Sequence, residues 1–166
     1  HLAHSCAGTS FVRPGDWSGE IPAGSDVALF SAAPHGASAG AIAEALQAAK
    51  SADLNVHVVD ASADFRFDNA ASFSSVYGID HPAPKLLGDF ISGVPEHVAG
   101  SDALHACQPG CFATAALLAA VPLVDAGVTT GDLFLNGVTG STGSGRSGPL
   151  GGTRTGSVSV GRWPIA

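Results

Sequence analysis

The sequence predicts an α/β fold that contains a doubly wound parallel sheet. Short apolar runs at 26–32 and 54–60 are typical of strands buried in such a sheet. Between them, residues 38–50 repeat small and apolar side chains at helical spacing. The three segments together have the order and length of a strand–helix–strand crossover unit, which joins neighbouring parallel strands.

The elements of this unit have recognisable boundaries. The first run is followed by Pro34, His35 and Gly36, which indicate a loop at the carboxyl end of a strand, where ligands of α/β proteins bind. Ser38 stands where a residue that caps the helix is expected. We interpret His57, inside the second run, as a hydrogen-bonded core residue.

The regions that flank this unit carry weaker patterns. Residues 1–25 mix Gly, Pro, Ser and Asp with single aromatics, and we expect an irregular connection with at most one short strand. Residues 61–97 are rich in turn formers, with a candidate strand at 89–94. A loop-rich stretch of this length is usually functional or well packed. Residues 103–107 suggest one further short strand.

The second half of the chain begins with its strongest helix. Residues 112–126 are rich in Ala and Leu and end before Gly127, which can supply a left-handed cap. Pro122 is expected to kink or divide the end of this helix. Residues 133–138 predict a strand that runs into a loop of glycines and hydroxyls at 140–146. The remaining residues, 147–166, are Gly-rich and weakly patterned.

Composition narrows the classes of partner. The 166 residues include 7 Lys+Arg and 14 Asp+Glu, a formal net charge of −7, and 45% are hydrophobic. This suits one domain or parts of two, and an acidic chain argues against nucleic acid and anionic membranes as partners. The longest apolar stretch, 115–124, is shorter than the roughly 18 residues that a membrane span needs. Three irregularly spaced cysteines suit a reducing compartment, so we expect a cytoplasmic protein.

Cys111 is the sharpest candidate for chemistry. Pro109 and Gly110 make a tight turn before it, and the helix that follows presents unpaired backbone N–H groups. Such a position favours a thiolate, which can attack an acyl carbon, and the same N–H groups could hold an oxyanion or a phosphate. The alternative is that Cys111 is a small buried hydrophobic residue, as most free cysteines are.

Other candidate residues are weaker. Cys107 and Cys111 have a C-x3-C spacing that matches neither a redox pair nor a common zinc pair, and we expect no metal site. Asp64 and Arg66 either pair with each other, the interpretation we favour, or hold a ligand carboxylate. The loop at 140–146 either admits a ligand close to its backbone or is a flexible connection.

Six motifs, in order along residues 26–146, resemble the N-acetyl-gamma-glutamyl-phosphate reductase family within the aspartate-semialdehyde dehydrogenase-like group. They are APHGAS at 33–38, DASADFR at 60–66, YG and HP at 77–78 and 81–82, GVPE at 93–96, PGCFAT at 109–114 and GSTGSGR at 140–146. Their shared order makes the resemblance far more specific than any one motif. It places the family's active-site cysteine at Cys111.

The resemblance implies an enzyme of arginine biosynthesis. Such an enzyme uses NADPH to reduce N-acetyl-glutamyl 5-phosphate to N-acetyl-glutamate 5-semialdehyde and phosphate, through a thioester on Cys111. By similarity, Arg66 or Arg146 would bind anionic groups of the substrate. The NADP cofactor would be flanked by two backbone segments, represented by Pro34, His35 and Gly36 and by Gly140, Ser141, Gly143 and Gly145.

The chain also departs from the family pattern. It lacks the Gly-rich turn that binds the cofactor pyrophosphate and the later His-Arg-His stretch that supplies the catalytic histidine. We therefore expect an internal piece of a reductase, poorly active or inactive alone. Residues 1–110 would be the remaining part of the NADP-binding Rossmann-like domain, and 111–166 the beginning of an α+β catalytic and dimerisation domain. The full-length protein is expected to be a homo-oligomer.

Two alternative functions stay open at this point. One is the sister reduction of an aminoadipyl phosphate in lysine biosynthesis, often on a carrier-protein-linked substrate, although the motif at 109–114 favours the arginine enzyme. The other is a non-catalytic remnant that folds or pairs with a partner. The retained Cys111 and the Gly/Ser loop argue for a parent gene that encodes an enzyme.

Overall fold

The computed structural model describes residues 16–129, 133–139 and 154–160, and the chain divides into two compact units, His1–Gly110 and Cys111–Ala166. The predicted loop at 140–146, with Gly140, Ser141, Gly143, Gly145 and Arg146, lies outside the described residues. The functional identity expected of each half stays a prediction.

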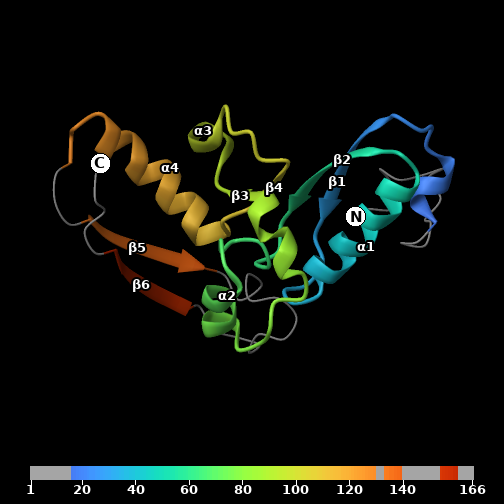
Figure 1. Ribbon diagram of the computed structural model, residues 1–166. Coiled ribbons are helices and arrows are strands. Elements are labelled where there is room, and N and C mark those ends of the chain that lie inside the picture. Colours follow the sequence, from blue (N-terminus) through green and yellow to red (C-terminus); the bar gives the residue numbers. More distant parts are fainter. Residues whose placement is uncertain (1–15, 130–132, 140–153, 161–166) are drawn as a thin grey trace, which may run out of the picture. The chain divides into compact units, whose positions relative to one another are not determined.

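A four-stranded parallel sheet forms the centre of the first unit (Figure 1). The strands are β1 (Asp26–Ser31), β2 (Asn55–Asp60), β3 (Phe90–Ser92) and β4 (His105–Cys107), in the spatial order β1-β2-β4-β3. All three pairings are parallel. The predicted α/β class with a parallel sheet is therefore confirmed, and each of these strands lies at or within a predicted segment.

One short 3-10 helix, η1 (Trp17–Glu20), precedes the sheet. The helices that connect its strands are α1 (Ser38–Ser51), α2 (Ala70–Tyr77), η2 (Pro84–Asp89) and α3 (Pro95–Val98). Only α1 was predicted. Between 16 and 25 the chain contains η1 and no strand, which agrees with the irregular connection expected for the described part of that segment.

The core of the first unit lies on the side of the sheet that faces α1. Ala39 and Ile42 of α1 pack there with Val58 of β2, together with Phe65 and Cys107. The ring of Phe65 stacks on that of Phe90, with centroids 3.7 Å apart and planes 7° from parallel. Burial of each large apolar side chain of this kind contributes about 1.5–3 kcal/mol.

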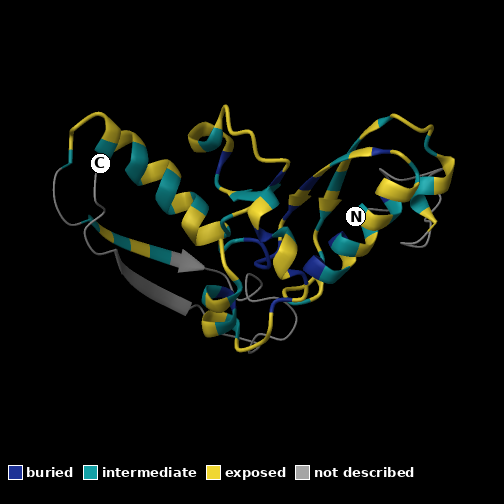
Figure 2. Ribbon diagram, in the orientation of Figure 1, coloured by how far each residue is buried: buried dark blue, intermediate teal, exposed yellow. Residues whose placement is uncertain are grey.

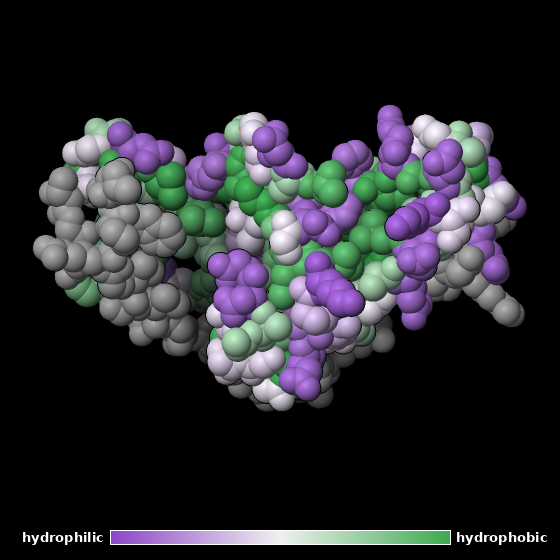
Figure 3. Space-filling model, in the orientation of Figure 1, coloured by the Kyte–Doolittle hydropathy of each residue, from purple (hydrophilic) through white to green (hydrophobic). Residues whose placement is uncertain are grey.

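The other face of β1 and β2 is exposed, in contrast to the prediction of strands buried on both faces. Burial alternates along both strands, and the register partners Phe30 and Val59 are 76% and 36% exposed (Figure 2). Ala106 and Ile91 continue the same row across β4 and β3. Hydrophobic residues accordingly reach the visible surface between hydrophilic ones (Figure 3).

The start of α1 differs from the prediction. Ser38 is the first helical residue, and the capping position belongs to Ala37, whose side chain makes no capping bond. The Ser38 hydroxyl instead donates to the carboxylate of Asp60 at 2.7 Å. A buried acceptor at the end of the neighbouring strand therefore outcompetes the local backbone for this hydroxyl.

The second unit contains α4 (Cys111–Asp125) and a two-stranded antiparallel sheet of β5 (Leu133–Thr139) and β6 (Arg154–Val160). The predicted helix and the predicted strand at 133–138 are confirmed, whereas β6 was not predicted. Pro122 lies inside α4 and does not divide it, and Gly127 adopts the expected left-handed conformation with φ of 66°. Among the described residues, no helix is both long and apolar enough to cross a membrane.

Candidate active site

Cys111 occupies the first position of the 15-residue helix α4, and its side chain is exposed. The residue before it, Gly110, has φ of 104°, a conformation that favours glycine. The first backbone N–H groups of a helix have no partner within the helix, and they can stabilise negative charge close to them. The exposure of Cys111 contradicts the alternative of a buried hydrophobic residue and leaves its sulfur accessible to reagents.

Cys107 has the opposite surroundings. It is 1% exposed at the end of β4, and its Sγ donates to the backbone oxygen of Phe65 at 2.8 Å. Burial raises the pKa of the Cys107 thiol above its usual value. Cys107 is therefore a protonated core residue, and of the two thiols only Cys111 is both accessible and at a helix start.

Arg66 lies against the turn that precedes Cys111 in the chain. Its Nε donates to the backbone oxygen of Gln108 at 2.9 Å. Its guanidinium atoms lie 3.1–3.3 Å from the place that a Cβ on Gly110 would occupy. Gly110 therefore serves both the turn and the close approach of Arg66.

The favoured pairing of Arg66 with Asp64 is wrong, because both carboxylate oxygens of Asp64 are already used. Oδ1 accepts from the backbone N–H of Gly36 at 2.7 Å, and Oδ2 accepts from that of Ala39 at 2.9 Å. Asp64 is fully buried and satisfies N–H groups at the start of α1. This frees the guanidinium of Arg66 for other partners.

Three hydrogen bonds join the loop after β1 to the loop after β2, and we call this set the clasp. Two are the bonds to Asp64 from Gly36 and Ala39, and the third runs from the backbone N–H of Ala63 to Nδ1 of His35, at 2.9 Å. The two loops leave the carboxyl ends of adjacent parallel strands. The clasp therefore fixes the edge of the sheet at which ligands of α/β proteins bind.

A second buried carboxylate, that of Asp60, accepts hydrogen bonds from residues next to the clasp. Asp60, the last residue of β2, is fully buried and accepts from Ser38 Oγ at 2.7 Å, Ser62 N at 3.0 Å and Ser62 Oγ at 2.6 Å. Ser31 Oγ lies 2.6 Å from Ser38 Oγ. The sequence analysis did not predict this network. Asp60, at the end of a strand and followed two residues later by Ser62, is typical of a local turn in which an aspartate accepts hydrogen bonds, and it could have indicated part of the network.

The predicted cofactor residues of the first unit lie at this edge. Pro34 and His35 are exposed, and Gly36 has φ of 80°. The positive φ of Gly36 disfavours any larger residue there, whereas the nearest atom to an added Cβ, Cδ1 of Ile79 at 2.8 Å, ends a flexible side chain. Asp64 accepts hydrogen bonds from two N–H groups at the start of α1, those of Gly36 and Ala39.

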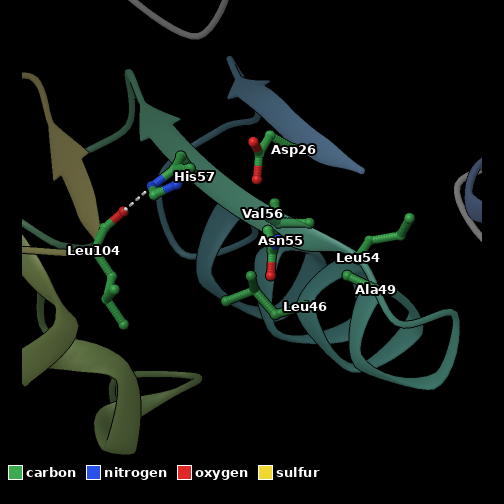
Figure 4. A pocket seen from close by; sticks show the side chains of 8 residues that line it. All are labelled: Asp26, Leu46, Ala49, Leu54, Asn55, Val56, His57 and Leu104. Atoms are coloured by element: carbon green, nitrogen blue, oxygen red, sulfur yellow. Dashed lines mark hydrogen bonds between the residues drawn. The ribbon is translucent and has the colours of Figure 1, made fainter. Parts of the chain in front are cut away.

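One hollow of the first unit lies away from this edge. A cavity of about 390 Å³ opens beside the amino ends of β1 and β2 (Figure 4). His57 lines it and is exposed, with Nδ1 3.1 Å from the backbone oxygen of Leu104, so the prediction of a core histidine is wrong. Within residues 16–129 and the described strands of the second unit, no three His, Cys, Asp or Glu residues gather as metal ligands.

Comparison with known proteins finds close sequence relatives, although no family model matches. The chain is 37% identical over 134 residues to the N-acetyl-gamma-glutamyl-phosphate reductase of Rhodopirellula baltica, which covers 79% of this chain and 37% of that protein. It is 36% identical over 135 residues to the reductase of the same name from Corynebacterium glutamicum, covering 79% and 35%.

A relative of a second kind also matches. The putative [LysW]-L-2-aminoadipate/[LysW]-L-glutamate phosphate reductase of Aeropyrum pernix is 43% identical over 99 residues, covering 58% of this chain and 26% of that protein. In each comparison the chain spans little more than a third, or less, of the relative's length.

Proposed function

From the premise that this chain belongs to the N-acetyl-gamma-glutamyl-phosphate reductase family, we propose that it acts in the NADPH-dependent reduction of N-acetyl-glutamyl 5-phosphate. The products are N-acetyl-glutamate 5-semialdehyde and phosphate. The single observation that carries the proposal is the position of Cys111, exposed at the first residue of α4. We place the reaction in arginine biosynthesis, in the cytoplasm, with a homo-oligomer as the working form.

The first step is acylation of Cys111. The thiolate attacks the acyl-phosphate carbon, a carbon–sulfur bond forms, and the carbon–oxygen bond to phosphate breaks as phosphate leaves with the electron pair. The oxyanion that develops in between is stabilised by backbone N–H groups at the start of α4. The product is a thioester on Cys111.

The second step reduces this thioester. When bound, NADPH supplies the hydride, which is the chemistry of a nicotinamide cofactor. The resulting thiohemiacetal collapses, the carbon–sulfur bond breaks, and Cys111 returns to its starting state as the aldehyde leaves. A general acid that protonates the oxygen of the thiohemiacetal takes this proton back as the aldehyde forms, so the net proton of the reaction is the one taken up by the phosphate that leaves in the first step.

The cofactor would lie at the carboxyl edge of the parallel sheet. We place the nicotinamide half of the cofactor against the loop of Pro34, His35 and Gly36, in which Pro34 and His35 are exposed. The clasp keeps the start of α1 closed, which directs the pyrophosphate to other N–H groups. We propose residues 1–110 as part of an NADP-binding Rossmann-like domain and 111–166 as the start of the catalytic domain, with Arg66 and Arg146 toward the substrate.

The proposal is tested by the acylation step alone, without NADPH. Mixing the full chain with N-acetyl-glutamyl 5-phosphate should release about one phosphate per chain in a rapid burst, because Cys111 reacts once and is not regenerated. Cys111→Ser should give no burst, and Cys107→Ser, the matched control, should retain it. Absence of a burst in the unmodified chain contradicts the proposal.

The similarity to the Aeropyrum pernix protein supports a second candidate, reduction of an aminoadipyl phosphate on a carrier. Both substrates would use the same thioester chemistry. A comparison of kcat/KM for the two acyl phosphates distinguishes them, since the preferred acyl chain should be favoured by at least about tenfold. A chain that acylates with neither substrate is a non-catalytic remnant.

A further inference from the structure

We propose that His35 is a hydrogen-bond donor to an oxygen atom of the bound nicotinamide cofactor, through Nε2–H, and that Asp64 is the positioning residue behind it. This inference deepens the proposed function and rests on it. It assigns a definite proton to the imidazole and a specific task to the clasp, beyond a general place for His35 near the cofactor.

The proton on His35 follows from its partner in the clasp. A backbone N–H can only donate, and that of Ala63 points at Nδ1 of His35 over 2.9 Å. Nδ1 is therefore the unprotonated, accepting nitrogen. In a neutral imidazole the proton then lies on Nε2, which becomes a donor. The same logic applies to His81, whose Nδ1 accepts from Ala83 N and whose Nε2 faces the backbone oxygen of Asp64 at 2.7 Å.

His81 and His35 differ in whether the Nε2–H group already has a partner within the protein. Nε2 of His81 is used inside the protein, and the residue is buried. His35 is exposed, and no described residue accepts a hydrogen bond from its Nε2. His35 therefore carries an oriented donor at the carboxyl edge of β1, where an α/β sheet receives its ligand. The complementary ligand group is an oxygen acceptor, such as a carboxamide carbonyl.

Asp64 is held well enough to orient this loop. Besides its two carboxylate bonds, its backbone N–H donates to Ser62 Oγ at 3.0 Å and its carbonyl accepts from His81. Through Gly36 N, the carboxylate fixes the residue that directly follows His35. Because each polar group of Asp64 has a partner, the loop is tied to a fixed point, which lowers the entropy cost of ordering it when a ligand binds.

Two substitutions of His35 separate the roles of its nitrogens. In His35→Asn the amide oxygen can take the place of Nδ1, so the clasp is retained while the outer donor is lost. In His35→Gln the amide nitrogen can take the place of Nε2, so the donor is retained while the clasp is weakened. On the full-length protein, binding of NADPH is measured by fluorescence titration without substrate, and stability by the thermal midpoint.

We expect one variant to change the Kd for NADPH and the other to change the thermal midpoint. His35→Asn should raise the Kd for NADPH about tenfold, as expected for one lost hydrogen bond, with a nearly unchanged thermal midpoint. His35→Gln should keep the Kd within about twofold and lower the midpoint by roughly 2–4 °C. An unchanged Kd in His35→Asn overturns the donor role.

Asp64 is tested by a double-mutant cycle with His35. Asp64→Asn removes the negative charge and places an amide N–H against a backbone N–H, so it should raise the NADPH Kd several-fold. If Asp64 acts through His35, it should add little in the His35→Asn background. Fully additive effects overturn the positioning role. If the unmodified chain binds NADPH but gives no phosphate burst, the proposed function fails, while the inference is still decided by the Kd values.

Discussion

Cys107 and Cys111 are four residues apart in the sequence, yet the properties that govern thiol chemistry differ between them. Cys107 ends a central strand, is 1% exposed and donates to a backbone oxygen. Cys111 begins a helix and is exposed. The turn between them, with Gly110 at φ of 104°, takes the chain from the core to the surface. The position within the strand–turn–helix junction, rather than the type of residue, therefore determines which cysteine can react.

The largest expected difference between the two cysteines is in catalysis. Cys111→Ser should lower kcat/KM for reduction of the acyl phosphate by at least about 10³-fold, because the hydroxyl is a far weaker nucleophile than a thiolate. Cys107→Ser keeps a donor for the Phe65 oxygen and should leave kcat/KM within about threefold. Steady-state kinetics on the full-length protein measures both. Comparable losses in the two variants would contradict the assignment of the nucleophile.

Chemical modification should show the next largest difference. Iodoacetamide at neutral pH should modify Cys111 at least about 10²-fold faster than Cys107, because the buried thiol reacts only after local opening of the structure. Peptide mass spectrometry over a time course gives the two rates and also that of Cys6. Equal, slow rates at Cys107 and Cys111 would argue against an accessible nucleophile.

For the free energy of unfolding, the larger effect is expected at Cys107 and the smaller one at Cys111. Cys107→Ala should lower the free energy of unfolding by about 1–3 kcal/mol, through a small cavity and an unsatisfied Phe65 oxygen. Cys111→Ala removes an exposed side chain and should change it by less than about 0.5 kcal/mol. Urea unfolding, with equal slopes in both variants, is the measurement. A larger loss in Cys111→Ala would mean that this thiol makes a structural contact.

The smallest effect is the pH dependence of stability. Burial raises the pKa of Cys107 above 9.0, so above that pH the unfolded chain releases a proton that the folded chain keeps, and stability should fall as pH rises. Burial lowers the pKa of His105 below 6.5, so below that pH the unfolded chain takes up a proton that the folded chain does not, and stability should fall as pH falls.

Two variants distinguish the loss of stability at alkaline pH from the loss at acid pH. Cys107→Ala should flatten the alkaline side of the profile and leave the acid side in place. His105→Asn keeps an acceptor for the backbone N–H of Val58, which Nδ1 of His105 accepts at 3.3 Å, and it should flatten the acid side. Urea midpoints measured from pH 5 to pH 10 give both slopes. A profile that neither variant alters would show that other groups control it.

The fold could be predicted where a local pattern agrees with the tertiary environment. The strands β1 and β2 lie in the two apolar runs, α1 follows the helical spacing of residues 38–50, and α4 follows the stretch rich in Ala and Leu. Helix α2 was missed because it is short and rich in Ser, although Asn69 caps its start and Gly78 ends it with φ of 70°. Asn69 and Gly78 are typical of the two ends of a helix, and they would have indicated α2 even though its residues have low helix propensity.

The candidate site could be predicted only at Cys111, whose surroundings come from adjacent residues. The clasp joins residues 28 or 25 positions apart in the chain, and neither partner signals the other in the sequence. The sequence therefore predicted an ion pair of Asp64 with its neighbour Arg66, and a capping bond of Ser38 within its own helix. In the structure both side chains form long-range hydrogen bonds instead, because a buried carboxylate without partners is costly.

The strand order has a consequence for how the first unit folds. Pairing of Asp26 with Asn55 requires closure of a chain segment that α1 itself shortens, so β1, α1 and β2 can assemble early. Pairing of Val59 with Ala106 closes a longer stretch of chain, which costs more entropy. We therefore expect β4 to dock after β1, α1 and β2 have assembled. Because β4 leads directly to Gly110 and Cys111, we expect the reactive thiol to reach its final setting late in folding.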